Sequence, residues 1–294
     1  MDLKHILKTF RIEQDFFVGI DSDGCVFPTM DIKQKDCFHP LIIAHWGLQA
    51  IEKELRETAE FVNLYSIHRG TNRFPALALT FDMLRTRKDV LSKGVNVPEL
   101  CSLKRLIAKA GTPSNSTLAT AISHNHDPEL KKILDWSLAT NEAIEKKVKG
   151  IAPFKWVHEC LNKLTSTCDA IVVSQTPVEA LEREWKEHNI RHYVKLIAGQ
   201  EMGSKADHIS LTAKGHYPDK RIILVGDALG DLNTAHSLGI NFYPIKPGHE
   251  EKSWEELLTT GLDRFLADKF TTDYQTNLIT DFRKLLPDQP PWAI

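Results

Sequence analysis

Two pairs of closely spaced aspartates are candidates for catalysis or metal binding. Asp21 and Asp23 are separated by one residue and are followed by Gly24. In this pair, one carboxylate could attack an electrophilic phosphorus atom while the other moves a proton. Asp227 and Asp231 are separated by three residues, and two such acids could bind a hard divalent cation through oxygen. Each pair also has a structural interpretation, because Asp-Gly is a turn signal and Asp227 could cap a helix.

Two single residues could complete such a site. Ser174 follows the apolar run 170–173, where a hydroxyl and neighbouring backbone amides could hold a phosphoryl oxygen. Lys205 could neutralise charge on a transferring group, although most lysines are simply solvated. We interpret the nearby Thr176 as a helix cap, with proline at the first helical position and Glu179 closing a capping box.

The acids and Ser174 stand close to the ends of segments that are typical of buried strands. Five apolar segments span residues 16–20, 170–173, 194–198, 221–225 and 240–245. Helical patterns separate the later segments; one covers residues 229–238 and is followed by Gly239. This alternation predicts the α/β class, with a Rossmann-like parallel sheet and helices on both faces. Because ligands bind beyond the carboxyl ends of such strands, these distant residues could converge on one cleft.

The stretch between the first and second strands differs from the rest because its patterns are helical. Candidate helices span residues 42–64, 74–91, 98–110 and 130–149. Between them lie segments rich in Gly, Pro, Asn and Ser, which favour loops. We therefore predict an α/β core domain made of residues 1–29 and 150–294. A helical cap domain over residues 30–149 interrupts it.

Taken in this order, the polar residues resemble the four motifs of the haloacid dehalogenase superfamily. The resemblance covers the predicted core, about residues 15–30 and 150–245. The second acid of the first motif favours phosphate-ester chemistry over dehalogenation. An insert at this place is similar to the caps of phosphoglycolate phosphatase-like and β-phosphoglucomutase-like members, while Cys25 and Pro28 depart from common family residues. The motif matches are Asp21 and Asp23, then Ser174, then Lys205, then Gly226 with Asp227 and Asp231.

The resemblance implies a role for each matched residue. Asp21 would form an aspartyl-phosphate, and Asp23 would protonate the leaving oxygen and then activate water. Ser174 would hold the phosphoryl oxygens, and Lys205 would neutralise their charge. Mg²⁺ would be the cofactor. Its expected ligands are the carboxylates of Asp21 and Asp227 and the backbone carbonyl of Asp23. Asp231 would either bind the ion, directly or through water, or orient Lys205.

The function expected from these motifs is Mg²⁺-dependent hydrolysis of a small phosphate monoester. Two alternatives stay open. One is a phosphomutase of the β-phosphoglucomutase type, in which a second hydroxyl takes the phosphoryl group from the aspartate. The other is a non-catalytic module that binds a phosphorylated ligand, although retention of both Asp21 and Asp23 argues against it.

Five polar residues are candidates for recognising the substrate. Arg69, Asn72 and Arg73 lie together in a glycine-containing segment that could contact a second phosphate, a carboxylate or sugar hydroxyls. A turn between helices with solvated arginines is the alternative. Lys33, which follows the first motif, and Gln175, which follows Ser174, could also touch the substrate.

Composition limits the other functions. The formal net charge of −2 gives no bias toward nucleic acid or an anionic membrane. The five cysteines are odd in number and form no CxxC, which argues against a disulfide framework or structural zinc. The N-terminus lacks the apolar core of a signal peptide, and no apolar run approaches the roughly 18 residues of a membrane span. We expect a cytoplasmic monomer or homodimer whose partner is a small phosphorylated metabolite.

Overall fold

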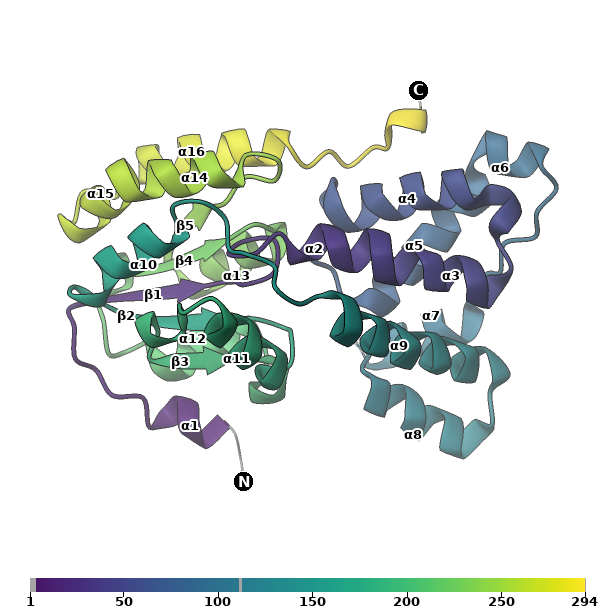
Figure 1. Ribbon diagram of the computed structural model, residues 1–294, viewed down its shortest axis with the longest axis horizontal. Helices are drawn as coiled ribbons and strands as arrows, with labels where there is room; N and C mark the ends of the chain where they lie inside the picture. Colours follow the sequence, from purple (N-terminus) through teal and green to yellow (C-terminus); the bar gives the residue numbers. More distant parts are fainter. Residues whose placement is uncertain (1–3, 111–112, 294) are drawn as a thin grey trace. The chain divides into compact units, whose positions relative to one another are not determined.

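The computed structural model describes residues 4–110 and 113–293, which cluster into two compact units. An α/β unit runs up to Met30 and resumes over Gly150–Leu285, and a helical unit comprises Asp31–Lys149 and the segment from Leu286 onward (Figure 1). The sequence assigned residues 286–294 to the α/β domain, but Trp292 packs within the helical unit. Its ring lies 5.6 Å from that of Phe61 and 4.2 Å from the guanidinium of Arg87.

The α/β unit is built on one parallel sheet, as predicted. All five predicted strands are confirmed, and their order is β3-β2-β1-β4-β5. The first strand is therefore central, and each of its residues is buried, which explains its continuous apolar sequence. The strands are β1 (Phe16–Ile20), β2 (Cys168–Val173), β3 (Leu196–Ala198), β4 (Ile222–Gly226) and β5 (Asn241–Pro244).

Helices cover both faces of the sheet. Phe16, Val18 and Ile20 share one apolar core with side chains from α10, α11, α14 and α15. Gly19 faces the other way, since a Cβ added there would lie 3.7 Å from Ile209 of α12, and α13 contacts β4 and β5 on the sheet as well. Figure 1 shows α14 and α16 beside β5, and α16 contacts that strand. The helices are α1 (Lys4–Lys8), α10 (Val157–Thr165), α11 (Val178–Glu187), α12 (Lys205–Thr212), α13 (Leu229–Leu238), α14 (Glu250–Glu256), α15 (Leu262–Leu266) and α16 (Thr272–Lys284).

The helical unit has its own apolar core, but two of its four predicted helices are each divided into two. The expected helix over residues 42–64 is divided at Gly47, whose φ of 67° ends α3 in the left-handed conformation. The one over 74–91 is divided at Arg87, whose backbone is extended. The helix α8 was not predicted. After α2 (Thr29–Ile32) and a π-helical turn (Lys33–Phe38), the helices are α3 (His39–Trp46), α4 (Glu52–Leu64), α5 (Arg73–Thr86), α6 (Lys88–Ser92), α7 (Cys101–Ala110), α8 (Asn115–Asn125) and α9 (Pro128–Lys147).

Two general features complete the description of the chain. All five cysteines are free thiols. Among the helices of residues 4–110 and 113–293, none has the length and apolar character needed to cross a bilayer.

Candidate active site

The register of the sheet brings the first and fourth motifs to one edge. Ile20 at the end of β1 lies opposite Val172 of β2 and Val225 of β4. The chain continues in register for one more residue, because the amide of Asp21 donates to the carbonyl of Val225 at 2.9 Å. Asp21 and Asp227 thus leave adjacent parallel strands at their carboxyl ends, where the sequence placed the cleft.

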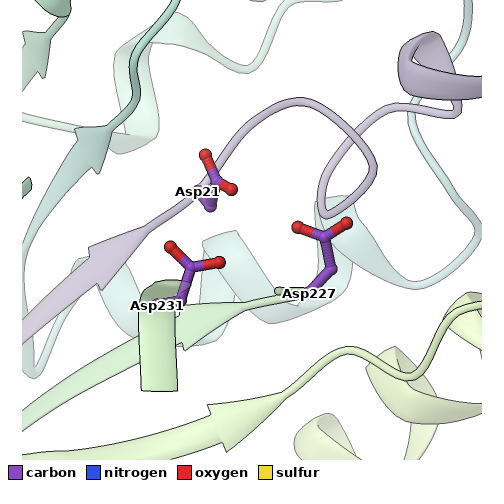
Figure 2. Close-up of side chains that lie close together, drawn as sticks. All are labelled: Asp21, Asp227 and Asp231. Carbon is purple, nitrogen blue, oxygen red and sulfur yellow. The ribbon is translucent and has the colours of Figure 1, made fainter. Parts of the chain in front are cut away.

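Three buried carboxylates gather at this edge. Oxygens of Asp21, Asp227 and Asp231 lie within 4.8 Å of one another. Figure 2 shows these three side chains close together. Asp231 comes from the first turn of α13, and its Oδ2 accepts a hydrogen bond of 3.2 Å from the amide of Ala228. The interpretation of Asp227 as a helix cap is therefore wrong, since Ala228 stands at that position and Asp231 reaches back to its amide.

Glycine is required at position 226 by the approach of Asp231. A Cβ added to Gly226 would lie 2.5 Å from the Cγ of Asp231, far inside van der Waals contact. The missing side chain lets the carboxylate pack against the end of β4, which explains the Gly-Asp sequence of the fourth motif.

Lys205 joins two of the three acids. Its Nζ lies 2.7 Å from Oδ2 of Asp21 and 2.6 Å from Oδ1 of Asp231. The lysine is the first residue of α12, whose start is fixed by a capping box between Ser204 and Asp207. The structure thus brings the predicted lysine to the predicted acids, and the contact of Asp231 with Lys205 is one of the two roles that the sequence left open for this acid.

The electrostatics of the cluster are unbalanced. Burial raises the pKa of Asp21 well above its ordinary value, Asp231 and Asp227 raise it further, and Lys205 acts in the opposite direction. Burial opposes the charge on Lys205, but attraction by Asp21 and Asp231 is stronger and raises the pKa of its ammonium. Three carboxylates and one ammonium leave a formal charge of −2 in a buried site, so a further positive charge would stabilise the ionised form.

The donor set fits a hard divalent cation. All three ligand groups are carboxylates, which suit Mg²⁺, Ca²⁺ or Mn²⁺ rather than a soft metal. The formal charge of −2 matches one such ion. The carboxylates in this group are those of Asp21, Asp227 and Asp231, whereas the carboxylate of Asp23 makes different contacts.

Asp23 is held by two hydroxyl groups. Thr176 donates to its Oδ2 at 2.7 Å, and Thr29, the first residue of α2, donates to its Oδ1. The sequence interpreted Thr176 as a helix cap, and this is wrong: α11 begins at Val178, and Pro177 at the cap position makes no side-chain bond. A hydroxyl three residues beyond the end of β2 was the available signal, but its partner is 153 residues away in the sequence.

Ser174 and Gln175 lie on the loop after β2. Ser174 is buried, its amide donates to the carbonyl of Ala198 at 3.0 Å, and its Oγ accepts from the amide of Thr176 at 3.1 Å. The exposed Gln175 donates to the carbonyl of Gly203 at 3.1 Å, in the segment that precedes Lys205. This loop is therefore tied to the loop that carries the third motif.

The four other substrate candidates belong to the helical unit. Lys33 is buried and begins the π-helical turn. Arg69 is also buried, and it donates to the carbonyl of Leu64 at 2.9 Å. Asn72 caps α5, where its side chain accepts from the amide of Phe74 at 3.0 Å. The alternative of solvated arginines at a turn is thus wrong for Arg69.

Arg73, the first residue of α5, links that helix to α9 within the helical unit. Its Nη1 donates to Asn141 at 2.7 Å and to the hydroxyl of Ser137 at 3.0 Å, both on α9, and its guanidinium lies 5.0 Å from the ring centre of Phe38. Burial lowers its pKa to about 10. Arg73 therefore contributes to packing of the helical unit.

Sequence comparison places the chain in a family. A profile of the haloacid dehalogenase-like hydrolase family matches residues 90–245, more than half of the chain. The match includes Ser174, Lys205, Asp227 and Asp231, and Asp21 lies before it. This protein is a hydrolase of the haloacid dehalogenase-like family. No curated protein is similar enough in sequence to match the chain.

Several solved structures are similar to the chain. One is a haloacid dehalogenase-like family hydrolase from Streptococcus pneumoniae, at 15% identity over 82% of this chain and 90% of that one, with a TM-score of 0.44. A haloacid dehalogenase-like hydrolase from Xanthomonas campestris has 11% identity over 89% and 96%, and a TM-score of 0.47. A predicted phosphoglycolate phosphatase from Haemophilus somnus has 15% identity over 80% and 86%, and a TM-score of 0.44.

Proposed function

We propose that the protein is a Mg²⁺-dependent phosphatase that hydrolyses a small phosphate monoester with Asp21 as nucleophile. The observation that carries this proposal is the buried cluster of Asp21, Asp227 and Asp231 with Lys205 bridging two of the acids. It lies at the carboxyl edge of a parallel sheet, where this class of fold binds ligands. Membership of the hydrolase family supports the same conclusion.

The proposed substrate sets a requirement on the charge of the site. A phosphate monoester is an anion and is repelled by three carboxylates, so the site must provide positive charge before a carboxylate can attack phosphorus. Lys205 supplies one such charge. A bound Mg²⁺, held by Asp21, Asp227 and Asp231 and by the carbonyl oxygen of Asp23, would supply the rest and polarise the phosphoryl group.

Each residue has a defined part in the reaction. A carboxylate oxygen of Asp21 forms a bond to phosphorus as the bond to the leaving oxygen breaks, and Asp23 gives its proton to that oxygen. Asp23 then removes a proton from a water molecule, which attacks phosphorus and frees Asp21. Lys205 favours the ionised form of Asp21 and neutralises the phosphoryl oxygens, which Ser174 helps to hold.

Recognition of the leaving group is proposed for Lys33, Arg69, Asn72, Arg73 and Gln175. Asn72 and Arg73 already serve the structure of the helical unit, so contact with a substrate would be an additional role for them. We also propose that residues 30–149, which make up most of the helical unit, act as a cap. Single replacements should then raise KM for some phosphate esters more than for others.

Two experiments test the proposal. Purified protein should release inorganic phosphate from members of a diverse phosphomonoester panel in Mg²⁺ and not after chelation. Asp21→Asn should lower this activity about a thousandfold or more, because the nucleophile is lost. The control Asp263→Asn changes an exposed acid that pairs with Lys163 in the same unit and should leave turnover unchanged.

The outcomes separate the proposal from its alternatives. A phosphoryl label on the protein that is released by hydroxylamine and absent from Asp21→Asn would support an aspartyl-phosphate. If the label moves to a second hydroxyl of a sugar phosphate and no phosphate is released, the protein is a phosphomutase. Binding of phosphate esters without any turnover indicates a binding module, and full activity of Asp21→Asn refutes the nucleophile.

A further inference from the structure

We propose that Thr176 is a positioning residue for the reaction: its hydroxyl holds the carboxyl group of Asp23 in the orientation from which Asp23 serves the leaving oxygen. This inference rests on the proposed function, which gives Asp23 the role of proton donor. Thr176 itself touches neither phosphorus nor the leaving group.

The contacts of Asp23 fix the plane of its carboxyl group. Rotation about the last torsion of an aspartate is soft, so a carboxyl group without anchors samples many orientations. Here Thr176 binds Oδ2 at 2.7 Å and Thr29 binds Oδ1. The two hydroxyls come from different elements, the loop after β2 and the start of α2, and together they restrict that rotation.

Thr176 is itself held in place by its backbone. Its amide donates to Oγ of Ser174 at 3.1 Å, and its carbonyl accepts from the amide of Gln200 at 3.2 Å. Gly199 allows this close approach, since a Cβ added there would lie 2.6 Å from the carbonyl oxygen of Thr176. The hydroxyl thus projects from a backbone that is held by its own loop, at Ser174, and by the neighbouring loop, at Gln200.

Capping of α11 does not account for Thr176. A threonine just before Pro177 would ordinarily accept a hydrogen bond from a free amide at the start of the helix. In this protein the amide of Val178, the first residue of α11, donates to the carboxylate of Glu201 at 3.1 Å instead. With Glu201 in that role, the hydroxyl of Thr176 is available to donate to Asp23.

The inference predicts an effect that depends on the leaving group. An alkoxide is a poor leaving group and needs a proton from Asp23, whereas 2,4-dinitrophenolate leaves without one. Losing the hydroxyl should therefore slow the first turnover of an alkyl phosphate about tenfold, the effect of one lost hydrogen bond to an ionisable group. The first turnover of 2,4-dinitrophenyl phosphate and the KM for both substrates should be little changed.

The test compares variants with and without the hydroxyl. Thr176→Val keeps the shape and removes the donor, Thr176→Ala removes the donor in a smaller side chain, and Thr176→Ser keeps the donor. Thr212→Val is the matched control, because it removes a buried threonine hydroxyl of the same unit that bonds a backbone carbonyl at 2.6 Å. Rapid quench measures alcohol release, stopped-flow absorbance measures dinitrophenolate, and melting temperatures monitor folding.

Every outcome decides the matter. The inference is supported if Thr176→Val and Thr176→Ala slow only the alkyl phosphate and Thr176→Ser behaves as the wild type. It is overturned if both substrates slow equally, or if neither does. Asp23→Asn separates this from the proposed function: wild-type turnover of the alkyl phosphate by that variant refutes the role of Asp23 itself. If Asp23→Asn turns over the alkyl phosphate slowly and Thr176→Val turns it over at the wild-type rate, only the role of Thr176 is refuted.

Discussion

Replacing Lys205 with methionine is the perturbation whose effect the structure defines best. The variant keeps a long apolar side chain and removes the ammonium that lies 2.7 Å from Asp21 and 2.6 Å from Asp231. Breaking a buried charge pair by removing one partner costs about 3–5 kcal/mol. If the chemical step loses that whole amount, kcat falls by roughly two to nearly four powers of ten.

The pH dependence should change in a defined direction. Burial already raises the pKa of Asp21, and Lys205 opposes this rise. Without the ammonium, the pKa of Asp21 moves further up, so the carboxyl group stays protonated to higher pH and cannot attack phosphorus. The acidic limb of the kcat profile of Lys205→Met should therefore lie at higher pH than that of the wild type, and raising the pH should recover part of the activity.

A second lysine provides the control for stability. Lys195 pairs with the buried Asp169, which lies opposite Phe17 near the start of β1, at the far edge of the sheet from the candidate active site. Lys195→Met should lower the free energy of unfolding without lowering kcat for phosphate release. The reasoning fails if Lys205→Met keeps kcat within about threefold of the wild type with an unchanged pH profile.

Two further predictions concern packing and pH-dependent stability. Gly226→Ala should destabilise the protein by about 1–3 kcal/mol through overpacking and should lower activity by displacing Asp231. The control is Gly230→Ala, where an added Cβ meets nothing within 4 Å, and this variant should be neutral or stabilising in urea unfolding. Equal effects of the two replacements on stability would contradict the packing argument. Burial lowers the pKa of His208 from 6.5 to about 4, so the unfolded chain binds the proton more readily than the folded protein does. The free energy of unfolding therefore falls as the pH drops from 7 toward 4, and at pH 5 it should be about 2 kcal/mol lower than at pH 7. Urea unfolding at pH 7 and pH 5 should show a smaller loss for His208→Gln, and an equal loss would refute this account.

The fold was predictable where local sequence and tertiary environment agree. Strands buried on both faces need continuous apolar segments, so all five could be located from the sequence. Helix α13 was predicted with its bounds because Gly239, with φ of 66°, ends it. In the helical unit, the apolar pattern continues through Gly47 and Arg87, and the breaks at those residues depend on packing that periodicity does not record.

The site was predictable in its residues and not in its contacts. Motif order selected Asp21, Lys205, Asp227 and Asp231, and the parallel sheet explains why residues so far apart in the chain meet. The pairing of Lys205 with two acids, and the position of Asp231 against Gly226, require coordinates. Thr176 shows the limit most clearly, because its local sequence favours a helix cap.

Sequence patterns alone were enough to predict the α/β class, the five strands and the acids at the strand ends. These depend on properties that act over a few residues: alternation of apolar segments with helical patterns, and polar residues where strands stop. Tertiary structure decided which groups share charge and hydrogen bonds. Glu201 satisfies the first amide of α11, and Thr176 then binds Asp23. Such a choice is set by partners brought close in space, because a hydroxyl or carboxylate binds the donor or acceptor that folding places within about 3 Å.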